Sequence, residues 1–544
     1  MGSVCLWLAV VAAGLLWTAA LTAAAARIPP TGWRLVLLAL ALAVPVLLLA
    51  LLVAPLVLLQ RPGWWIYGIS AWLAAIGGGL WILRAGAAER SVADALNGAG
   101  GAGEPVAAGW WPVGLLALSF LAASVACGTV AIIDNAASAD LAQRQLEAQS
   151  RLRIRLPVPI PAAADALPLY LEAAGLLEDD PALTADNSPL HQLAPDASAP
   201  ARAELLSRHA DALTAVRQAA DAEACGASEQ WRAADIDTFL ERTAMLRLCA
   251  RFLALAARHE AATGDMQGAL ADIVRLRRVA RHATDKPVLL TGGVGLAIDS
   301  LALATLADVL PLARQADGPL LAGPLSQQLT APGTSPTTIL MGEETFGLAE
   351  FAEMAAAGPV VAADLDEAAA PLYAQWVAGP LFRLSVLPEE LSAYSSCLER
   401  YQQAAATESL AARQILVREA EQTAANGGTL AQLVAPGLSS FLESQNRFDA
   451  KRAAAGVLLA ATRQRLETGS LPDTLEKLVP TKLEAVPADS FLGEPLQKPL
   501  RLLQTTGEWT IYSVGPNGND DGGPLPEGAE PTTSNDDIGL SMKR

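Results

Sequence analysis

Residues 236–283, which read IDTFLERTAMLRLCARFLALAARHEAATGDMQGALADIVRLRRVARHA, decide the fold class. Apolar side chains recur every three or four residues before and after Gly264-Asp265, a spacing typical of helices that bury one face. Gly264 and Asp265 interrupt the pattern, so the stretch predicts a helix over 236–263, a tight turn and a second helix. The sequence therefore indicates a helical hairpin near the middle of the chain.

The same spacing extends outward from this hairpin. We predict further helices at about 203–222, 287–315, 318–330, 341–357, 361–377, 387–424 and 446–468. The hairpin resembles one unit of a tetratricopeptide-like repeat, but its signature does not recur at a fixed period. An ordinary hairpin is therefore the preferred interpretation and a repeat array the alternative. Either way, the predicted fold class is mainly α.

Four uncharged apolar segments precede the helical region, at 4–26, 35–60, 64–83 and 110–133. Each is about as long as the roughly 20 residues that a helix needs to cross a bilayer. Tryptophans lie at several segment ends, where their rings favour the headgroup layer. Because the segments hold no ionisable side chain, we predict a four-helix anchor rather than a transport pathway. The first segment has an alternative interpretation as a signal peptide, but no basic residue precedes it.

Basic residues in the short loops predict the orientation of this anchor. With the N-terminus outside, Arg27, Arg34, Arg84 and Arg90 lie inside and Arg61 lies outside. Four helices return the chain to the side on which it started. We therefore expect a multi-pass protein of the cell (inner) membrane whose large C-terminal region is extracytoplasmic.

These patterns divide the chain into four expected parts. They are a transmembrane anchor over 1–134, a stalk helix with a Pro/Ala-rich connector over 135–202, a helical extracytoplasmic domain over 203–445, and an α+β segment over 446–544. The stalk is expected to be exposed through Leu141, Leu146 and Leu152, and to stop at Pro157.

The C-terminal part differs in pattern from the rest of the chain. A long helix is expected to end at Gly469, and a short helix to follow over 473–478. Two candidate strands at 500–504 and 509–514 are joined by Thr505-Thr506-Gly507, which predicts a β-hairpin. A loop rich in glycine, asparagine and aspartate then leads to Asp536-Asp537-Ile538-Gly539.

This ending resembles the C-terminal part of the major pseudopilins of type II secretion. The resemblance covers about residues 446–539 and rests on the long helix, the Val486-Pro487-Ala488-Asp489 turn, the small sheet and the Asp-Ile-Gly ending. It implies a calcium-binding loop, with Asp536 and Asp537 at the positions of family carboxylates and Asn517 where the family usually has an acidic ligand. The prepilin leader of that family is not recognisable, so we do not expect a pseudopilin.

The ectodomain as a whole also resembles a group of uncharacterised bacterial membrane-anchored helical proteins that carry this ending. Its landmarks here are the Cys225 region, the Gly264-Asp265 turn and Gly342-Glu343-Glu344. This second resemblance implies no activity.

Ligand supply independently favours calcium in the C-terminal loop. Ca²⁺ takes six to eight oxygens from carboxylates, amides and backbone carbonyls on flexible turns. The candidate ligands are Asn517, Asn519, Asp520, Asp521, Asp536 and Asp537. Their spacing is not that of an EF-hand. The alternative is a solvated tail whose polar residues only satisfy turns.

Catalytic signals are weak, and we assign no catalytic residue. Glu343 and Glu344 could be imagined as a carboxylate pair, but adjacent residues on a helix do not face each other. Cys225, Cys249 and Cys397 are odd in number, so a Cys225–Cys249 disulfide and buried free thiols both stay open.

We therefore expect a non-enzymatic, membrane-anchored scaffold or protein-binding module, with Ca²⁺ as a structural ion. The alternatives are an accessory component of a secretion or envelope-assembly machine and an extracytoplasmic hydrolase with an unrecognised site. The expected partners are the lipid bilayer and a protein. A net charge of −18 argues against nucleic acid, because phosphate binding needs a basic surface. The oligomeric state is left open.

Overall fold

The computed structural model describes most of the chain after residue 135. The described residues are 136–153, 164–178, 199–226, 236–357, 383, 386–492, 498–525 and 536–543. All four predicted membrane segments, and the predicted helix at 361–377, lie outside them. Within the described ranges, the chain is mainly helical with one small sheet, which confirms the coarse fold class.

The chain divides into two compact units. One comprises Met1–Gln143 and Glu350–Glu389, and the other Arg144–Ala349 and Glu390–Arg544. In the described part of the first unit, Arg383 donates a hydrogen bond to the carbonyl oxygen of Ala355, and Leu141 and Phe351 are buried.

The predicted hairpin forms the centre of the second unit. Helix α9 (Ile236–Thr263) begins and ends where the sequence predicts, and α10 (Met266–Ala283) follows it. Gly264 adopts a left-handed φ of 93° in the turn, which a residue with a Cβ rarely adopts. Asp265 is the N-cap of α10, because its Oδ1 accepts a hydrogen bond from the Gly268 amide at 2.9 Å.

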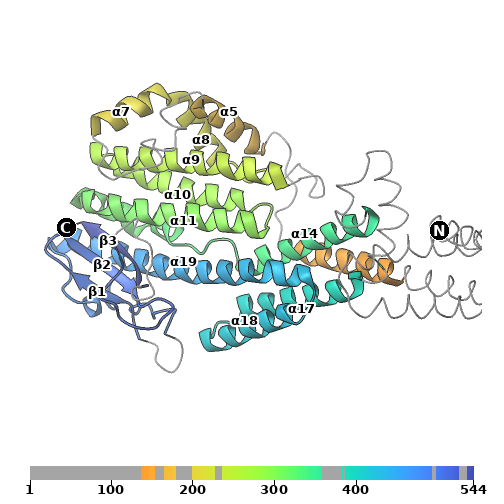
Figure 1. The fold of residues 1–544 in the computed structure, drawn as a ribbon. Helices are drawn as coiled ribbons and strands as arrows, with labels where there is room; N and C mark the ends of the chain where they lie inside the picture. The colour runs from red at the N-terminus through yellow and green to blue at the C-terminus, as the bar shows by residue number, and fades with distance from the viewer. Residues whose placement is uncertain are drawn as a thin grey trace, which may run out of the picture. The chain divides into compact units, whose positions relative to one another are not determined.

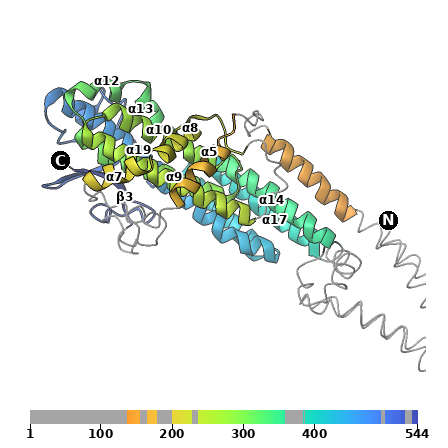
Figure 2. The same cartoon turned by 90° about the horizontal axis from the view of Figure 1, so that it is seen from above.

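Further helices pack on both sides of this hairpin. Helices α5 (Leu167–Glu178), α7 (Ala199–Arg208) and α8 (Ala210–Asp221) contact α9, whereas α11 (Leu289–Val309) contacts both α9 and α10 (Figure 1). After α11 come the 3-10 turns η3 (Leu310–Leu312) and η4 (Gln315–Asp317) and the short helices α12 (Gly318–Ala322) and α13 (Pro324–Leu329). Helix α13 lies beside α10 (Figure 2).

Helix α11 and the turn after it are long and apolar enough to cross a membrane. Among the described residues, Leu289–Leu312 is the one helical stretch that meets this test of length and composition, and 56% of its apolar window is buried inside the protein. Its contacts with α9, α10 and α19 show the role of a core helix.

Several helices differ from their predicted bounds. The single helices predicted at 203–222 and 318–330 are each two helices, α7 and α8 and then α12 and α13, and α11 ends at Val309 instead of 315. Helix α14 (Pro336–Ala357) starts five residues before the predicted 341. The single helix predicted at 387–424 is two helices, α17 (Leu387–Ala406) and α18 (Leu410–Ala425). The break occurs where the Ser409 hydroxyl accepts a hydrogen bond from the Ala412 amide and caps α18.

Helix α19 (Thr429–Thr468) is much longer than the predicted 446–468. Pro436 and Gly437 suggest a helix breaker in the sequence, yet both lie inside α19. Packing holds this part of the helix, because the Tyr401 hydroxyl donates to the Ala435 carbonyl oxygen at 3.1 Å. Gly437 faces Leu289 of α11 so closely that an added Cβ would lie 3.0 Å from its Cδ2.

The small sheet has strand order β1-β2-β3 and is antiparallel throughout. Strands β1 (Arg501–Gln504) and β2 (Glu508–Ser513) form the predicted hairpin, after the 3-10 turn η8 (Leu475–Leu478). Strand β3 (Ile538–Lys543) was not predicted. Trp509 is fully buried and shares one hydrophobic core with residues of α9, α10, α11 and α19. The expected domain boundary at residue 446 therefore falls inside one helix and inside one continuous core.

The expected exposed stalk is a packed helix. Residues 136–153 are helical, and of the three leucines expected to be exposed only Leu146 is so, at 67%, whereas Leu141 and Leu152 are buried. In the second unit, Gln145 donates to the Leu348 carbonyl oxygen at 2.8 Å, and Arg151 pairs with Glu344 at 2.7 Å.

Candidate metal-binding loop

The glycine-rich loop after β2 is a compact structure that closes on the start of β3. Gly515, Gly518, Gly522 and Gly523 all have left-handed φ values between 67° and 106°. A Cβ added to Gly515 would overlap the backbone carbonyl oxygen of Asp536, so the two ends of the loop touch there. This closure brings residues 515–523 beside Asp536 and Asp537.

Three carboxylates hold the loop by accepting hydrogen bonds from backbone amides. Asp537 Oδ2 accepts from the amides of Gly523 at 2.7 Å and Asp521 at 3.1 Å. Asp536 Oδ2 accepts from the Asn517 amide at 3.1 Å, and Asp521 Oδ2 accepts from the Asp536 amide at 3.3 Å. The structure thus brings together Asp521, Asp536 and Asp537 of the predicted ligand set.

The other candidate ligands have different partners. Asp520 turns toward the sheet, where its carboxylate pairs with Arg501 and accepts from the Tyr512 hydroxyl at 2.9 Å. Asn517 donates from its side chain to Asp521 at 2.8 Å, and its carbonyl accepts from the Asn519 amide at 2.6 Å. Asn519 thus contributes its backbone to the turn.

Two buried carboxylate oxygens fit a bound cation. Asp536 Oδ1 and Asp537 Oδ1 are buried and have no hydrogen-bond partner among the described residues. Burial raises the pKa of Asp537, and the neighbouring charges of Asp521 and Asp520 raise it further. A hard cation such as Ca²⁺ would supply the missing partner. Within the part of the chain that is described, no three His, Cys, Asp or Glu side chains already converge as ligands, so loading would require these carboxylates to turn.

Asp489 supports the loop, although the sequence assigned it no role. It is buried, and its carboxylate accepts from the Ser513 hydroxyl at 2.6 Å and from the amides of Phe491 at 3.0 Å and Val514 at 2.9 Å. These bonds fix the end of β2, where the loop begins. The Val486-Pro487-Ala488-Asp489 turn is the feature of the sequence that could have indicated this role of Asp489.

The Gly342-Glu343-Glu344 landmark is a helix contact. Glu343 accepts from the Leu289 amide at 2.8 Å and so caps the start of α11, and burial raises the pKa of Glu343. Glu344 accepts from Arg151 at 2.7 Å and from Gln402 at 2.8 Å. Both carboxylates that the sequence suggested as a catalytic pair are therefore hydrogen-bonded to neighbouring helices.

The thiols and the buried histidine belong to the core. Cys225, Cys249 and Cys397 are buried and form no disulfide in the described part of the chain, so the Cys225–Cys249 disulfide is not formed. Burial raises the pKa of Cys249 to about 12, which suppresses the reactive thiolate. His282 contacts the Tyr170 hydroxyl at 3.0 Å, and burial lowers its pKa to about 4.

Asp285 predicts an unusual pH dependence of stability. It accepts from the Cys225 amide at 2.6 Å, and burial together with the charge of Asp165 raises its pKa from 3.8 to about 7. Between these two values the folded protein binds a proton that the unfolded chain does not, so this contribution to stability falls as pH rises. Asp285→Asn keeps an acceptor without the charge. We expect the variant to be more stable than the wild type at about pH 8, by on the order of 3 kcal/mol, because each pKa unit corresponds to about 1.4 kcal/mol.

This difference should fall to less than half of its pH 8 value by about pH 5, where the carboxyl is protonated in the folded protein but still mostly ionised in the unfolded chain, as measured by thermal unfolding of both full-length proteins at the two pH values. The depressed pKa of His282 makes the folded state less stable as pH falls below 6.5. That effect is common to both proteins and cancels in the difference. A stability difference that is the same at both pH values would show that Asp285 is not protonated in the folded state.

Comparisons with known proteins place this fold beside no characterised relative. No protein family, no curated protein and no solved structure matches the chain. The class that the structure itself defines is a mainly helical protein with a small antiparallel sheet at its C-terminal end.

Proposed function

We propose that this chain is a membrane-anchored extracytoplasmic scaffold that binds another protein, and that calcium stabilises its C-terminal loop. The observation that carries the calcium assignment is the pair of buried oxygens of Asp536 and Asp537 that have no partner among the described residues. A buried acceptor without a partner costs free energy, and a cation removes this cost. The resemblance of residues 446–539 to pseudopilin endings supports the same assignment. Calcium is abundant outside cells, so even a site of low calcium affinity would be occupied there.

The anchor and its orientation belong to the same proposal. They are supported by the four uncharged apolar segments before residue 134 and by the arginines between them. A continuous core joins α9, α10, α11 and α19 to the sheet, and a single packed body of this kind suits a scaffold. The hydrolase alternative gains no support from Glu343 and Glu344, since both carboxylates are engaged in contacts between helices.

Calcium should protect the C-terminal loop in the full-length protein. In detergent, millimolar Ca²⁺ is expected to slow hydrogen–deuterium exchange over residues 498–525 relative to EDTA, and to raise the melting temperature. At a calcium concentration 100 times the Kd, the stabilisation would be about 2.7 kcal/mol. The Asp536→Asn/Asp537→Asn double variant should lose the effect, because asparagine keeps the shape and removes the charges.

An Asp211→Asn variant is the matched control, because Asp211 is exposed in the first turn of α8, away from the loop. It should respond to calcium like the wild type. Equal exchange of residues 498–525 in Ca²⁺ and EDTA would contradict the calcium assignment.

A further inference from the structure

Strand β1 is an edge strand with one side open. In the described chain the sheet order is β1-β2-β3, so β1 pairs on one side with β2 and has no strand on the other. The hairpin closes with the Thr505 amide donating to the Glu508 carbonyl oxygen at 3.0 Å. Because bonding alternates along an antiparallel pair, Leu503 and Arg501 direct their backbone groups to β2. The backbone groups of Leu502 therefore point to the open side.

The chain already uses this edge just before Leu502. The Leu500 amide donates to the Pro487 carbonyl oxygen at 3.0 Å, and the Asp489 amide donates to the Lys498 carbonyl oxygen at 2.8 Å. Ala488 and Pro499 form an isolated antiparallel bridge there. This short pairing ends before β1 begins. Backbone hydrogen bonding on this side of β1 could therefore continue at Leu502, where the described chain supplies no further strand.

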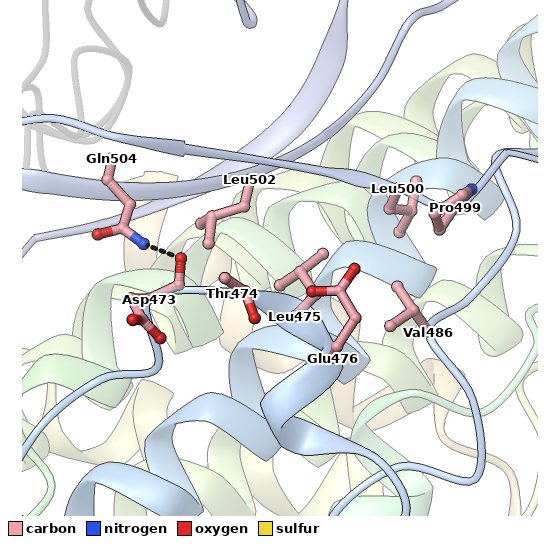
Figure 3. Close-up of a pocket in the computed structure, with 9 residues that line it drawn as sticks. All are labelled: Asp473, Thr474, Leu475, Glu476, Val486, Pro499, Leu500, Leu502 and Gln504. Atoms are coloured by element: carbon pink, nitrogen blue, oxygen red, sulfur yellow. Dashed lines mark hydrogen bonds between the residues drawn. The ribbon is translucent and has the colours of Figure 1, made fainter.

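A pocket lies beneath this open edge. It has a volume of about 400 Å³ and lies between β1 and the segment that leads into η8 (Figure 3). Leu500, Leu502 and Gln504 alternate along the chain and line it from one face of β1, and Leu475 lies opposite them. The Gln504 side chain donates to the Asp473 carbonyl oxygen at 2.9 Å and closes one end.

The rim of the pocket is acidic. Glu476 and Asp473 line it and are exposed. Asp473 pairs with Lys477 at 2.5 Å, whereas Glu476 has no ion-pair partner among the described residues. Hydrogen bonds from its own backbone and from Thr474 lower the pKa of Glu476, so this side chain is charged at neutral pH. A positively charged side chain of a ligand would complement it.

We propose that β1 binds an extended segment of a partner protein, which pairs with the backbone of Leu502 and extends the sheet by one strand. One apolar side chain of this segment occupies the pocket, and a Lys or Arg two residues away lies beside Glu476. In this mode of recognition, main-chain hydrogen bonds supply affinity, and pockets for alternate side chains supply specificity. The inference rests on the proposed protein-binding function and names its partner as a basic and apolar β-strand.

A labelled peptide tests this site on the full-length protein. The probe is a short acetylated peptide with a central Leu, a Lys two residues to either side and Thr at the alternate positions. We expect saturable binding by fluorescence anisotropy. Glu476→Lys should weaken binding at least about tenfold, since it replaces an attraction by a repulsion. The control Glu484→Lys makes the same charge change at an exposed residue outside the pocket and should alter binding less than about twofold.

N-methylation of the peptide separates strand addition from side-chain binding. In an added strand, alternate amides face β1 and the others face solvent. We expect methylation of one alternate set to weaken binding at least about tenfold, and methylation of the other set to change it less than about threefold.

Absence of saturable binding, equal effects of the two methylated peptides, or equal effects of Glu476→Lys and Glu484→Lys would each overturn the edge site. Calcium protection of residues 498–525 in the same preparation would show that the calcium-stabilised scaffold stands even if the peptide fails.

Discussion

Asp299→Ala is expected to destabilise the second unit by about 3–5 kcal/mol, because it leaves a buried positive charge without its partner. Arg277 and Asp299 form an ion pair at 3.0 Å, and each side chain is only 5% exposed. Arg277 also donates to the carbonyl oxygens of Leu329 at 2.7 Å and Ala331 at 2.6 Å, and its guanidinium lies 5.9 Å from the centre of the Phe448 ring. One side chain therefore ties α10 to α11, α13 and α19.

Thermal unfolding of the full-length protein measures this loss. The matched control is Glu204→Ala, which breaks the exposed Arg208–Glu204 pair and should cost no more than about 1 kcal/mol. The double variant Arg277→Met/Asp299→Leu should recover part of the stability, since apolar residues of similar size remove both buried charges but cannot donate to the carbonyl oxygens of Leu329 and Ala331. An Asp299→Ala protein as stable as the Glu204→Ala protein would show that the buried charge finds water or another partner.

Gly342→Ala is the second change with a large expected effect, a loss of about 3 kcal/mol. A Cβ at Gly342 would overlap the backbone carbonyl oxygen of Pro287, which a side-chain rotation cannot relieve. Helix α14 would have to move away from the start of α11, and the bond between Glu343 and the Leu289 amide would weaken. The measurements are the melting temperature and hydrogen–deuterium exchange at the start of α11.

Gly293→Ala is the control for helix propensity. Gly293 lies in α11, and nothing lies within 4 Å of an added Cβ. Alanine there should stabilise the protein by about 0.5–1 kcal/mol, because glycine weakens a helix interior. If Gly342→Ala behaved like Gly293→Ala, the close contact between α14 and Pro287 would not exist in solution.

Local patterns predicted the elements whose signals lie within one short stretch. Helix α9, the Gly264-Asp265 turn and the β1–β2 hairpin depend on apolar spacing and turn residues, and all three were predicted close to their observed bounds. Strand β3 was missed because it gains its stability from pairing with β2, a contact that no local pattern shows. The first half of α19 was missed because Pro436 suggests a break that the packing of neighbouring helices overcomes.

In the candidate site, too, some features could be predicted from the local sequence and others depend on tertiary contacts. Composition marked a loop rich in oxygen ligands, and the resemblance to pseudopilins singled out Asp536 and Asp537, but neither shows which oxygens have partners in the fold. The structure separates the candidates, since Asp520 pairs with Arg501 of β1, while Asp536 and Asp537 each keep one buried oxygen that has no partner in the part of the chain that is described. Such differences depend on contacts between residues far apart in the chain.

The sequence by itself determined that this protein is mainly helical, that a hairpin lies near its middle and that its C-terminal part contains a small sheet. These features follow from the periods of helices and strands and from turn residues, which act within a few positions. Tertiary structure alone decided that Glu343 and Glu344 hold helices together, that Leu152 is buried and that the backbone of Leu502 faces an open edge. The physical reason is that burial, ion pairing and the exposure of a sheet edge depend on residues that are close in space but far apart in the sequence.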